Sequence, residues 1–218
     1  MQDEILGLSQ TARGRVIVGV AVESCKQLSY AHMHLGNHEE SIRVMQVCLD
    51  SMCIAGHQER NSASSARGRR SPGSQRGEGL ASCYLAEVLT SIERAKDSED
   101  LDPVVLARCV VLQKKSVVIL QEFGNTDDLA VALQKLSSAI NDVGMLYENR
   151  PEFSESGQSS SLSLASTHYL ESLDLALKSK SSVSIIRAYS NLATSYMKRG
   201  LLLLRYQKRE RCRERQRQ

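Results

Sequence analysis

The sequence has few aromatic residues, few prolines and no long apolar run. Tryptophan is absent, and aromatic residues make up 4% of the 218 residues. β-Sandwich strands are rich in aromatic and β-branched residues, so this composition favours helices packed through Leu, Val, Ala and Ser. Only three prolines occur, which leaves room for long helices. No run approaches the roughly 20 apolar residues that a bilayer span requires, so we expect no membrane association.

The sequence also lacks the motifs of common catalytic and cofactor sites. No Walker-type phosphate loop, GxGxxG, HExxH or GxSxG string occurs, so we expect neither enzyme activity nor a cofactor. The six cysteines contain no CxxC pair, and Cys48, Cys53 and His57 form an incomplete zinc pattern, so we expect reduced thiols and no metal. The chain starts with the acidic MQDE, unlike a secretory signal, which indicates a cytoplasmic protein.

Basic residues are concentrated in two short stretches. Residues 205–218 contain seven Lys or Arg against two Glu, and residues 58–79 contain five Arg against two Glu. Because the whole chain carries a net charge of only +3, the rest of it is acidic. Binding to nucleic acid would therefore depend on these two stretches, and we treat it as an alternative to protein binding.

Residues 25–49 have the pattern of two helices joined by a tight turn. Small or apolar residues recur three to four positions apart on both sides of Gly36, which is the spacing of one face of a helix. Glycine adopts the left-handed conformation that ends a helix, so Gly36 is the predicted turn. The stretch 16–22, VIVGVAV, is β-branched but runs into this hairpin without a break, and we interpret it as the start of the first helix.

This hairpin resembles the tetratricopeptide repeat family, whose first helix carries a Leu, a small residue, an aromatic residue and a turn glycine at fixed intervals. Leu28, Ser29, His32 and Gly36 occupy those positions, and Ser41 occupies the small site of the second helix. A sharper copy near the end of the sequence consists of Tyr189, Leu192, Ala193, Tyr196 and Gly200.

Two further copies are weaker. Val143, Gly144 and Tyr147 fit the pattern with Pro151 in place of the turn glycine, and Leu85-Ala86 fits without a turn glycine. The resemblance therefore covers residues 16–204, with wider spacing than the usual repeat of about 34 residues.

The predicted organisation has three parts. Residues 1–15 form a polar lead, residues 16–204 form the helical array, and residues 205–218 form a basic tail. Within the array, stretches 58–79 and 154–163 contain few apolar residues and are predicted to be disordered insertions. Between them we expect helices at 80–92, 103–122 and 128–149, with Thr126 or Asp127 capping the last of these. Two more helices are expected at 164–178 and 184–199.

We expect an all-α protein, an α-solenoid of antiparallel helix pairs in a right-handed superhelix, with a generic helical bundle as the alternative fold. The resemblance implies a non-catalytic scaffold that binds a peptide or partner helix in a concave groove lined by the first helix of each pair. The predicted groove residues are polar positions of those helices: Lys26, Gln27, His34, Asn141, Glu148, Asn191 and Lys198. The repeat style is also similar to that of ciliary and cytoskeletal assembly factors, which is a narrower alternative.

Overall fold

The computed structural model describes residues 12–61, 71–96, 100–150 and 158–217, and this part of the chain is helical throughout apart from short connections. It contains no strand, so the all-α prediction is confirmed. The helices are α2 (Ala12–His34), α3 (His38–Asn61), α4 (Pro72–Arg94), α5 (Pro103–Phe123), α6 (Thr126–Asn149), α7 (Gln158–Lys178) and α8 (Ser182–Arg217).

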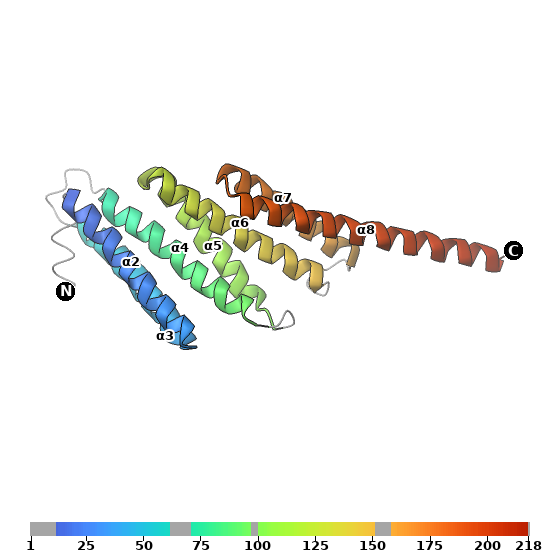
Figure 1. Ribbon diagram of the computed structural model, residues 1–218, viewed down its shortest axis with the longest axis horizontal. Helices are drawn as coiled ribbons and strands as arrows, with labels where there is room; N and C mark the ends of the chain where they lie inside the picture. Colours follow the sequence, from blue (N-terminus) through green and yellow to red (C-terminus); the bar gives the residue numbers. More distant parts are fainter. Residues whose placement is uncertain (1–11, 62–70, 97–99, 151–157, 218) are drawn as a thin grey trace.

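The helices pack in sequence order into an elongated, solenoid-like array (Figure 1). Each helix packs against the next one along the chain. In addition, α2 packs against α4, α4 against α6, and α6 against α8, so the even-numbered helices form one continuous layer. Helices α3, α5 and α7 pack mainly against even-numbered helices. Because α2, α4, α6 and α8 contact one another in succession, we call these four helices the inner layer and α3, α5 and α7 the outer layer.

Turn and cap residues position the helix ends. Gly36 has a φ of +77°, the left-handed conformation predicted for the turn between α2 and α3. Pro103 begins α5, as predicted, and Asp102 caps it by accepting hydrogen bonds from two backbone N–H groups. The cap of α6 is Asn125, which forms a capping box with Asp128. It lies one residue before Thr126 and two before Asp127, the two predicted caps.

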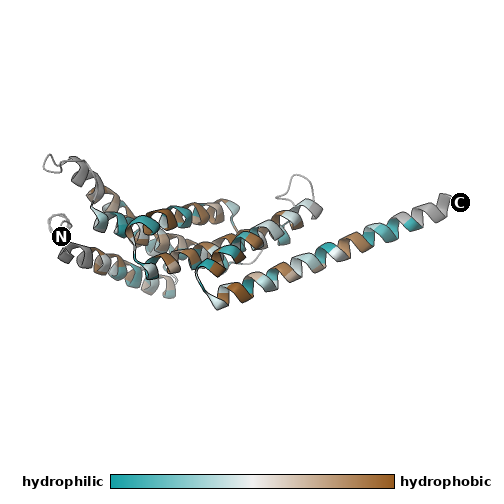
Figure 2. Cartoon of the chain, turned by 90° about the horizontal axis from the view of Figure 1, so that it is seen from above, coloured by the Kyte–Doolittle hydropathy of each residue, from teal (hydrophilic) through white to brown (hydrophobic). Residues whose placement is uncertain are grey.

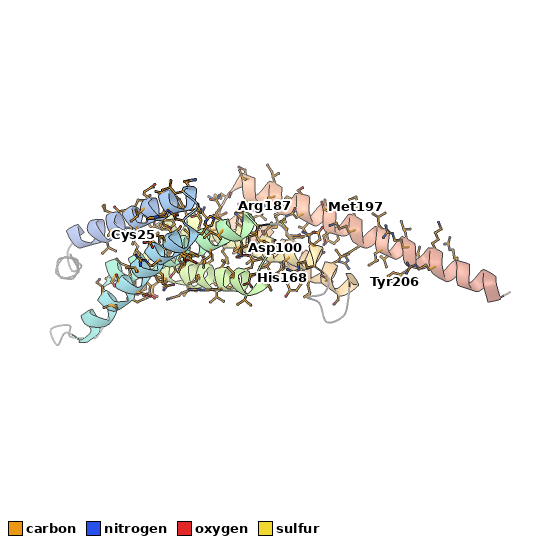
Figure 3. The ribbon with its side chains drawn as sticks, turned by 90° about the horizontal axis from the view of Figure 1, so that it is seen from below. Cys25, Asp100, His168, Arg187, Met197 and Tyr206 are labelled. Carbon is orange, nitrogen blue, oxygen red and sulfur yellow. The ribbon has the colours of Figure 1, made fainter. Side chains whose placement is uncertain are left out.

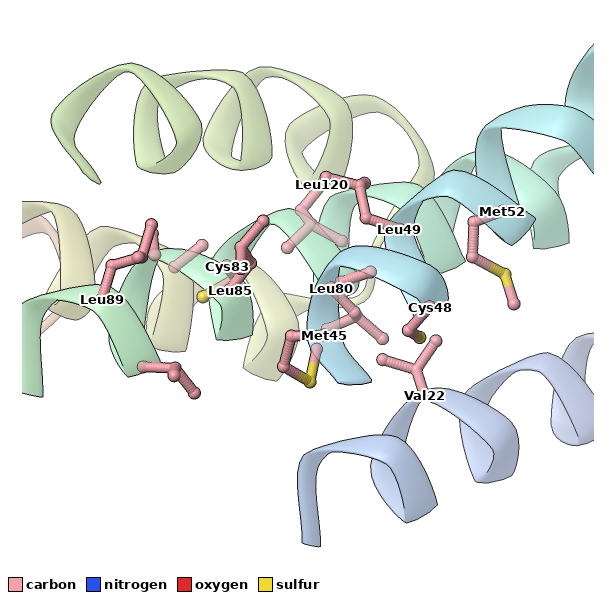
Figure 4. Close-up of a cluster of buried hydrophobic side chains, with 14 of the residues drawn as sticks. Val22, Met45, Cys48, Leu49, Met52, Leu80, Cys83, Leu85, Leu89 and Leu120 are labelled. Carbon is pink, nitrogen blue, oxygen red and sulfur yellow. The ribbon is translucent and has the colours of Figure 1, made fainter. Parts of the chain in front are cut away.

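The main hydrophobic core lies where α2, α3, α4 and α5 meet (Figure 4). Val22, Met45, Leu85 and Leu120 are fully buried there, one from each of these helices. The burial of Val22 agrees with the interpretation of 16–22 as part of a helix. A smaller cluster holds the C-terminal end of the array together: Tyr169 of α7 is completely buried and packs with Ala165 and with Leu192 of α8.

Pairs of buried serines connect neighbouring helices. Ser29 of α2 and Ser41 of α3 each donate a hydrogen bond to the other's backbone carbonyl, at 2.9 and 2.8 Å. Ser137 of α6 and Ser172 of α7 repeat this reciprocal arrangement at 2.8 and 2.9 Å. All four serines are buried, so each pair brings two backbones together without leaving a hydroxyl unsatisfied.

The predicted disordered insertion at 58–79 is wrong over most of its described length. Residues 58–61 belong to α3, and residues 72–79 form the first two turns of α4, with Ser71 as N-cap. Gly77 packs so closely that a Cβ there would lie 2.5 Å from Cγ1 of Val18. A Cβ on Gly79 would lie 2.9 Å from Cγ of Leu120. The lack of large apolar residues reflects close packing here, and residues 62–70 lie outside the described part.

The second predicted insertion and the tail also differ from expectation. Helix α7 begins at Gln158, so residues 158–163 of the predicted insertion are helical, while 151–157 lie outside the described residues. Ser161 and Leu162 are buried, which explains why this serine-rich stretch is ordered. Helix α8 continues to Arg217, so residues 205–217 extend the last helix beyond the array (Figure 2). Of the predicted lead, residues 1–11 lie outside the described part, and the remainder belongs to α2.

Candidate protein-binding surface

The candidate surface lies on the inner layer, formed by α2, α4, α6 and α8, and we call it the inner face. Helix α4 is buried over most of its length, and Arg76, Tyr84, Glu87 and Arg94 are among its few partly exposed residues. Their spacings of eight, three and seven residues keep the four positions within roughly 80° of one another around the helix axis, so they form one stripe. The stripe marks the side of α4 that faces away from α3 and α5.

Ion pairs connect this stripe to α6. Arg76 donates two hydrogen bonds to the carboxylate of Asp128, at 2.6 and 3.2 Å. Lys135 of α6 pairs with Glu87. A bidentate arginine–carboxylate contact fixes orientation better than a single bond does, so these pairs set the register of α4 against α6.

A second set of charges joins three helices at one carboxylate. Asp142 of α6 accepts hydrogen bonds from Arg94 of α4 at 2.6 and 2.9 Å, and from Arg187 of α8 at 2.7 Å. The Asp142 side chain is only 8% exposed, whereas the two arginine side chains are 42% and 36% exposed. Two guanidinium groups therefore share one buried carboxylate and keep N–H donors that face solvent.

A cavity of about 210 Å³ opens beside this arginine pair. It is lined by Glu93, Arg94, Lys96, Leu101, Leu106, Asp142, Met145 and Arg187. Three cations and two carboxylates line it, so its net charge is positive. Glu93 is already paired with Lys96 at 2.5 Å and also accepts a hydrogen bond from the Asp102 backbone. The arginine side of the cavity is the part suited to an added carboxylate.

The structure brings four of the predicted groove residues together between α6 and α8. The side-chain amide of Asn191 donates to Asn141 at 2.9 Å, and Lys198 pairs with Glu148 at 2.5 Å. Glu148 also accepts a hydrogen bond from the Tyr169 hydroxyl at 2.6 Å. Asn141 is fully buried, so it contributes to helix packing, while Asn191 and Lys198 are accessible at the surface.

The three predicted residues of α2 lie apart from those four, on the other side of α4. Lys26 lies over the ring of Tyr84 at 4.6 Å and forms an ion pair with Glu23 at 2.9 Å. Gln27 is exposed and hydrogen-bonds to Glu23, and His34 is exposed in the last turn of α2. Lys26 thus links α2 to the stripe on α4 through a cation–π contact.

Sequence reasoning missed Arg94, Asp142 and Arg187, which form the centre of the inner face. Each lies on a different helix, and none belongs to a recognisable motif. Only the stacking of α4, α6 and α8 places them together; Figure 3 labels Arg187 on α8. One signal was available: Asp142 follows Asn141, which the repeat register had placed on the groove side.

The outer layer has a cavity of a different character. About 300 Å³ lies between α5 and α7 with α6 as its floor, lined mainly by apolar residues such as Val110, Val143 and Leu146. His168 stacks on Tyr147 at its edge, with ring centroids 5.5 Å apart, and burial lowers the pKa of His168. The cavity lies between the outer-layer helices α5 and α7, which are not paired with each other as α5 and α7 each are with α6.

Two further findings bear on the class of protein. Among the described residues, no helix is long and apolar enough to cross a bilayer. Within the same residues, no group of three or more His, Cys, Asp or Glu is placed to hold a metal ion.

Comparison with family models, curated proteins and solved structures finds no match to this chain.

Proposed function

We propose that the protein is a non-catalytic interaction scaffold of the tetratricopeptide type, which binds a peptide or helix of a partner protein along the inner face. The observation that carries this proposal is the arginine pair on Asp142: two partly exposed guanidinium groups border a cavity on a face built from three helices. A carboxylate side chain of the partner is the group that this arrangement would hold, because guanidinium donors bind carboxylates in fixed geometry.

The repeat interpretation is supported by where the small residues lie. Ser29, assigned to the small site of the first repeat, contacts Ser41, assigned to the small site of its second helix. Gly144, assigned to the same site of another repeat, lies against Ala165 and Tyr169 of α7. The helices assigned as first helices are those of the inner layer, which is the layer expected to line a groove in such arrays.

The proposal places the scaffold in the cytoplasm, and assembly of cytoskeletal or ciliary structures is its narrower version. Nucleic-acid binding through the basic stretches is the competing hypothesis. Arg187 and Lys198, two basic residues of α8, are engaged by carboxylates of α6, which leaves the phosphate-binding capacity to the distal part of that helix.

The test compares partner capture by two full-length variants and one shortened chain. The first carries Arg94→Gln, Asp142→Asn and Arg187→Gln together, which removes the cluster's charges without leaving Asp142 unpaired. The second carries Lys178→Gln, at an exposed ion pair on α7, as a matched control. The third ends at residue 204. Pull-downs from cell extract, with and without nuclease, are quantified by mass spectrometry.

The proposal predicts that the triple variant loses its partners, while the control and the shortened chain keep them after nuclease treatment. The melting temperature of each variant shows whether the array remains folded. Partners that survive in the triple variant and disappear on truncation or nuclease treatment would replace the scaffold with a nucleic-acid-dependent function, because phosphate binding depends on the basic distal residues.

A further inference from the structure

Helix α8 carries an apolar stripe that no part of the described chain covers. Ile186, Ala193, Met197 and Leu204 are exposed, and their spacing of seven, four and seven residues places them on one face of the helix. Tyr189 and Tyr196 flank this face and are also exposed. We call these six residues the α8 stripe. Figure 3 shows α8 extending past the other helices, with Met197 labelled on it.

The corresponding faces of earlier inner-layer helices are covered by the helix that follows. Ser29 of α2 is completely buried against α3, and Gly144 of α6 is buried against α7. Ala86 of α4, which follows a leucine as Ala193 does, is also fully buried. Ala193 has the same place in the repeat register and is exposed. The α8 stripe therefore has the features of a helix-packing face, including the small residue that allows close approach.

The charges bordering the stripe have one sign. Residues 182–209 contain six basic residues and no Asp or Glu. Arg187 and Lys198 are paired with α6. Arg205, Lys208 and Arg209 are exposed and, among the described residues, have no ion pair. A helix that packs on this stripe would gain from acidic residues along its edges, since opposite charges across an interface favour association.

A second copy of the chain does not meet this requirement. An antiparallel pair of α8 helices centred on Ala193 would bring together two copies of residues 182–209, each with six basic residues and no Asp or Glu. Parallel pairing would set the same basic residues against each other. Like charges oppose both arrangements.

We propose that the α8 stripe docks an amphipathic helix of a protein partner, antiparallel to α8, with acidic residues flanking its apolar face and a small residue against Ala193. This interaction uses a different surface from the inner face and goes beyond the scaffold function proposed above. The partner helix would extend the array by one helix from another molecule, packing on α8 as α7 packs on α6.

The experiment uses two synthetic helical peptides as probes. Each has about 20 residues, an apolar face of Leu with one central Ala, and flanks of either Glu or Lys. Fluorescence anisotropy measures their binding to the full chain and to the variants Ala193→Leu and Ile186→Asp. Both sites are exposed, so circular dichroism should show folded proteins. We expect the Glu peptide to bind, the Lys peptide to bind at least about tenfold more weakly, and both variants to weaken Glu-peptide binding by about tenfold or more.

Ala193→Leu separates this proposal from its competitors. It blocks close helix approach yet adds apolar surface, so binding to phosphatidylserine–phosphatidylcholine vesicles would be unchanged or stronger. If the wild-type protein binds these vesicles but neither peptide, and Ala193→Leu binds the vesicles equally or more strongly, the stripe is a membrane-binding surface and the proposal is wrong. Sedimentation velocity that shows dimers lost in Ile186→Asp would overturn it in favour of a second copy. Equal binding of the two peptides, or an Ala193→Leu protein that binds like the wild type, would also refute it. Arg94→Gln alone alters the inner face on α4 and leaves α8 unchanged, so this variant should bind the Glu peptide normally. Failure of one proposal can therefore be distinguished from failure of the other.

Discussion

Gly144 is the position where a single added methyl group should have the clearest effect on the array. A Cβ at this glycine would lie 2.6 Å from Cε1 and 2.9 Å from Cδ1 of Tyr169, and 3.3 Å from the carbonyl oxygen of Ala165. The ring cannot retreat freely, because Tyr169 is completely buried and its hydroxyl donates a hydrogen bond to Glu148. Gly144→Ala must therefore separate α6 from α7 or displace the ring.

Two opposing effects determine the magnitude. Overpacking of a well-packed contact costs about 1 to 3 kcal/mol, whereas replacing glycine by alanine inside a helix gains up to about 1 kcal/mol. Gly200 is the matched control, because it also lies within a helix and a Cβ there would meet no atom within 4 Å. Gly200→Ala should raise the free energy of unfolding. The free energy of unfolding of Gly144→Ala should be about 1 to 3 kcal/mol lower than that of Gly200→Ala.

Urea unfolding followed by circular dichroism at 222 nm measures both variants, and a double-mutant cycle with Tyr169→Leu identifies the cause. In the Tyr169→Leu background, Gly144→Ala should stabilise the protein nearly as much as Gly200→Ala does. The coupling energy between positions 144 and 169 should then be on the order of 1 kcal/mol or more. If Gly144→Ala and Gly200→Ala stabilise the protein equally, or if the cycle shows no coupling, the described contact between α6 and α7 is wrong. Gly144→Leu should be more damaging than Gly144→Ala for the same reason.

Two further predictions test other parts of the array. A hydrogen bond with Cys48 lowers the pKa of the Cys25 thiol to about 7, so its alkylation by iodoacetamide should accelerate as the pH rises through that value. Cys48→Ala should move this midpoint upward, and a wild-type midpoint near ~8.5 would contradict the pairing. Arg76 lies inside α4 and pairs with Asp128, so trypsin should leave the following peptide bond intact in the native protein. Cleavage there, identified by mass spectrometry, would instead support the loop that the sequence predicted.

Features determined by neighbouring residues were predictable from the sequence. The turn at Gly36, the start of α5 at Pro103 and the end of α6 before Pro151 depend on local backbone geometry. The helical periodicity of the hairpin at 25–49 likewise needed no information about the rest of the chain. The order of the helices followed from these signals, because short connections leave consecutive helices little choice but to pack antiparallel.

The inner face was less predictable because its contacts join residues far apart in the sequence. Asp142 is separated by more than forty residues from both Arg94 and Arg187. A single charged residue on a helix gives no indication of its partner. The repeat pattern assigned Asn141 and Asn191 to the groove, but it did not predict the hydrogen bond between them. The pair Glu148–Lys198 was predicted as two groove residues, whereas the structure shows them bonded to each other.

The stretches interpreted as disordered show why a low apolar content misled the prediction. Disorder follows when a segment cannot bury enough surface to offset its ordering entropy, and that estimate usually counts large apolar side chains. Here the buried residues are glycines and serines, such as Gly77 at the start of α4 and Ser161 at the start of α7. Small residues bring helix backbones together, so the surface buried at these contacts belongs mainly to side chains of the neighbouring helix.

Serine has a specific advantage over alanine or glycine at such crossings, which explains its use at three helix interfaces. In the pairs Ser29–Ser41 and Ser137–Ser172, each hydroxyl donates to the carbonyl of the opposite serine, and Ser166 contacts Ser195 at 2.9 Å between α7 and α8. An alanine would permit the same approach but would provide no directional contact. Because each reciprocal bond is satisfied in only one alignment, the pairs specify register where a smooth contact would let the helices slide. A serine-rich chain can therefore be an ordered helical array, provided that its serines face one another across the helix interfaces.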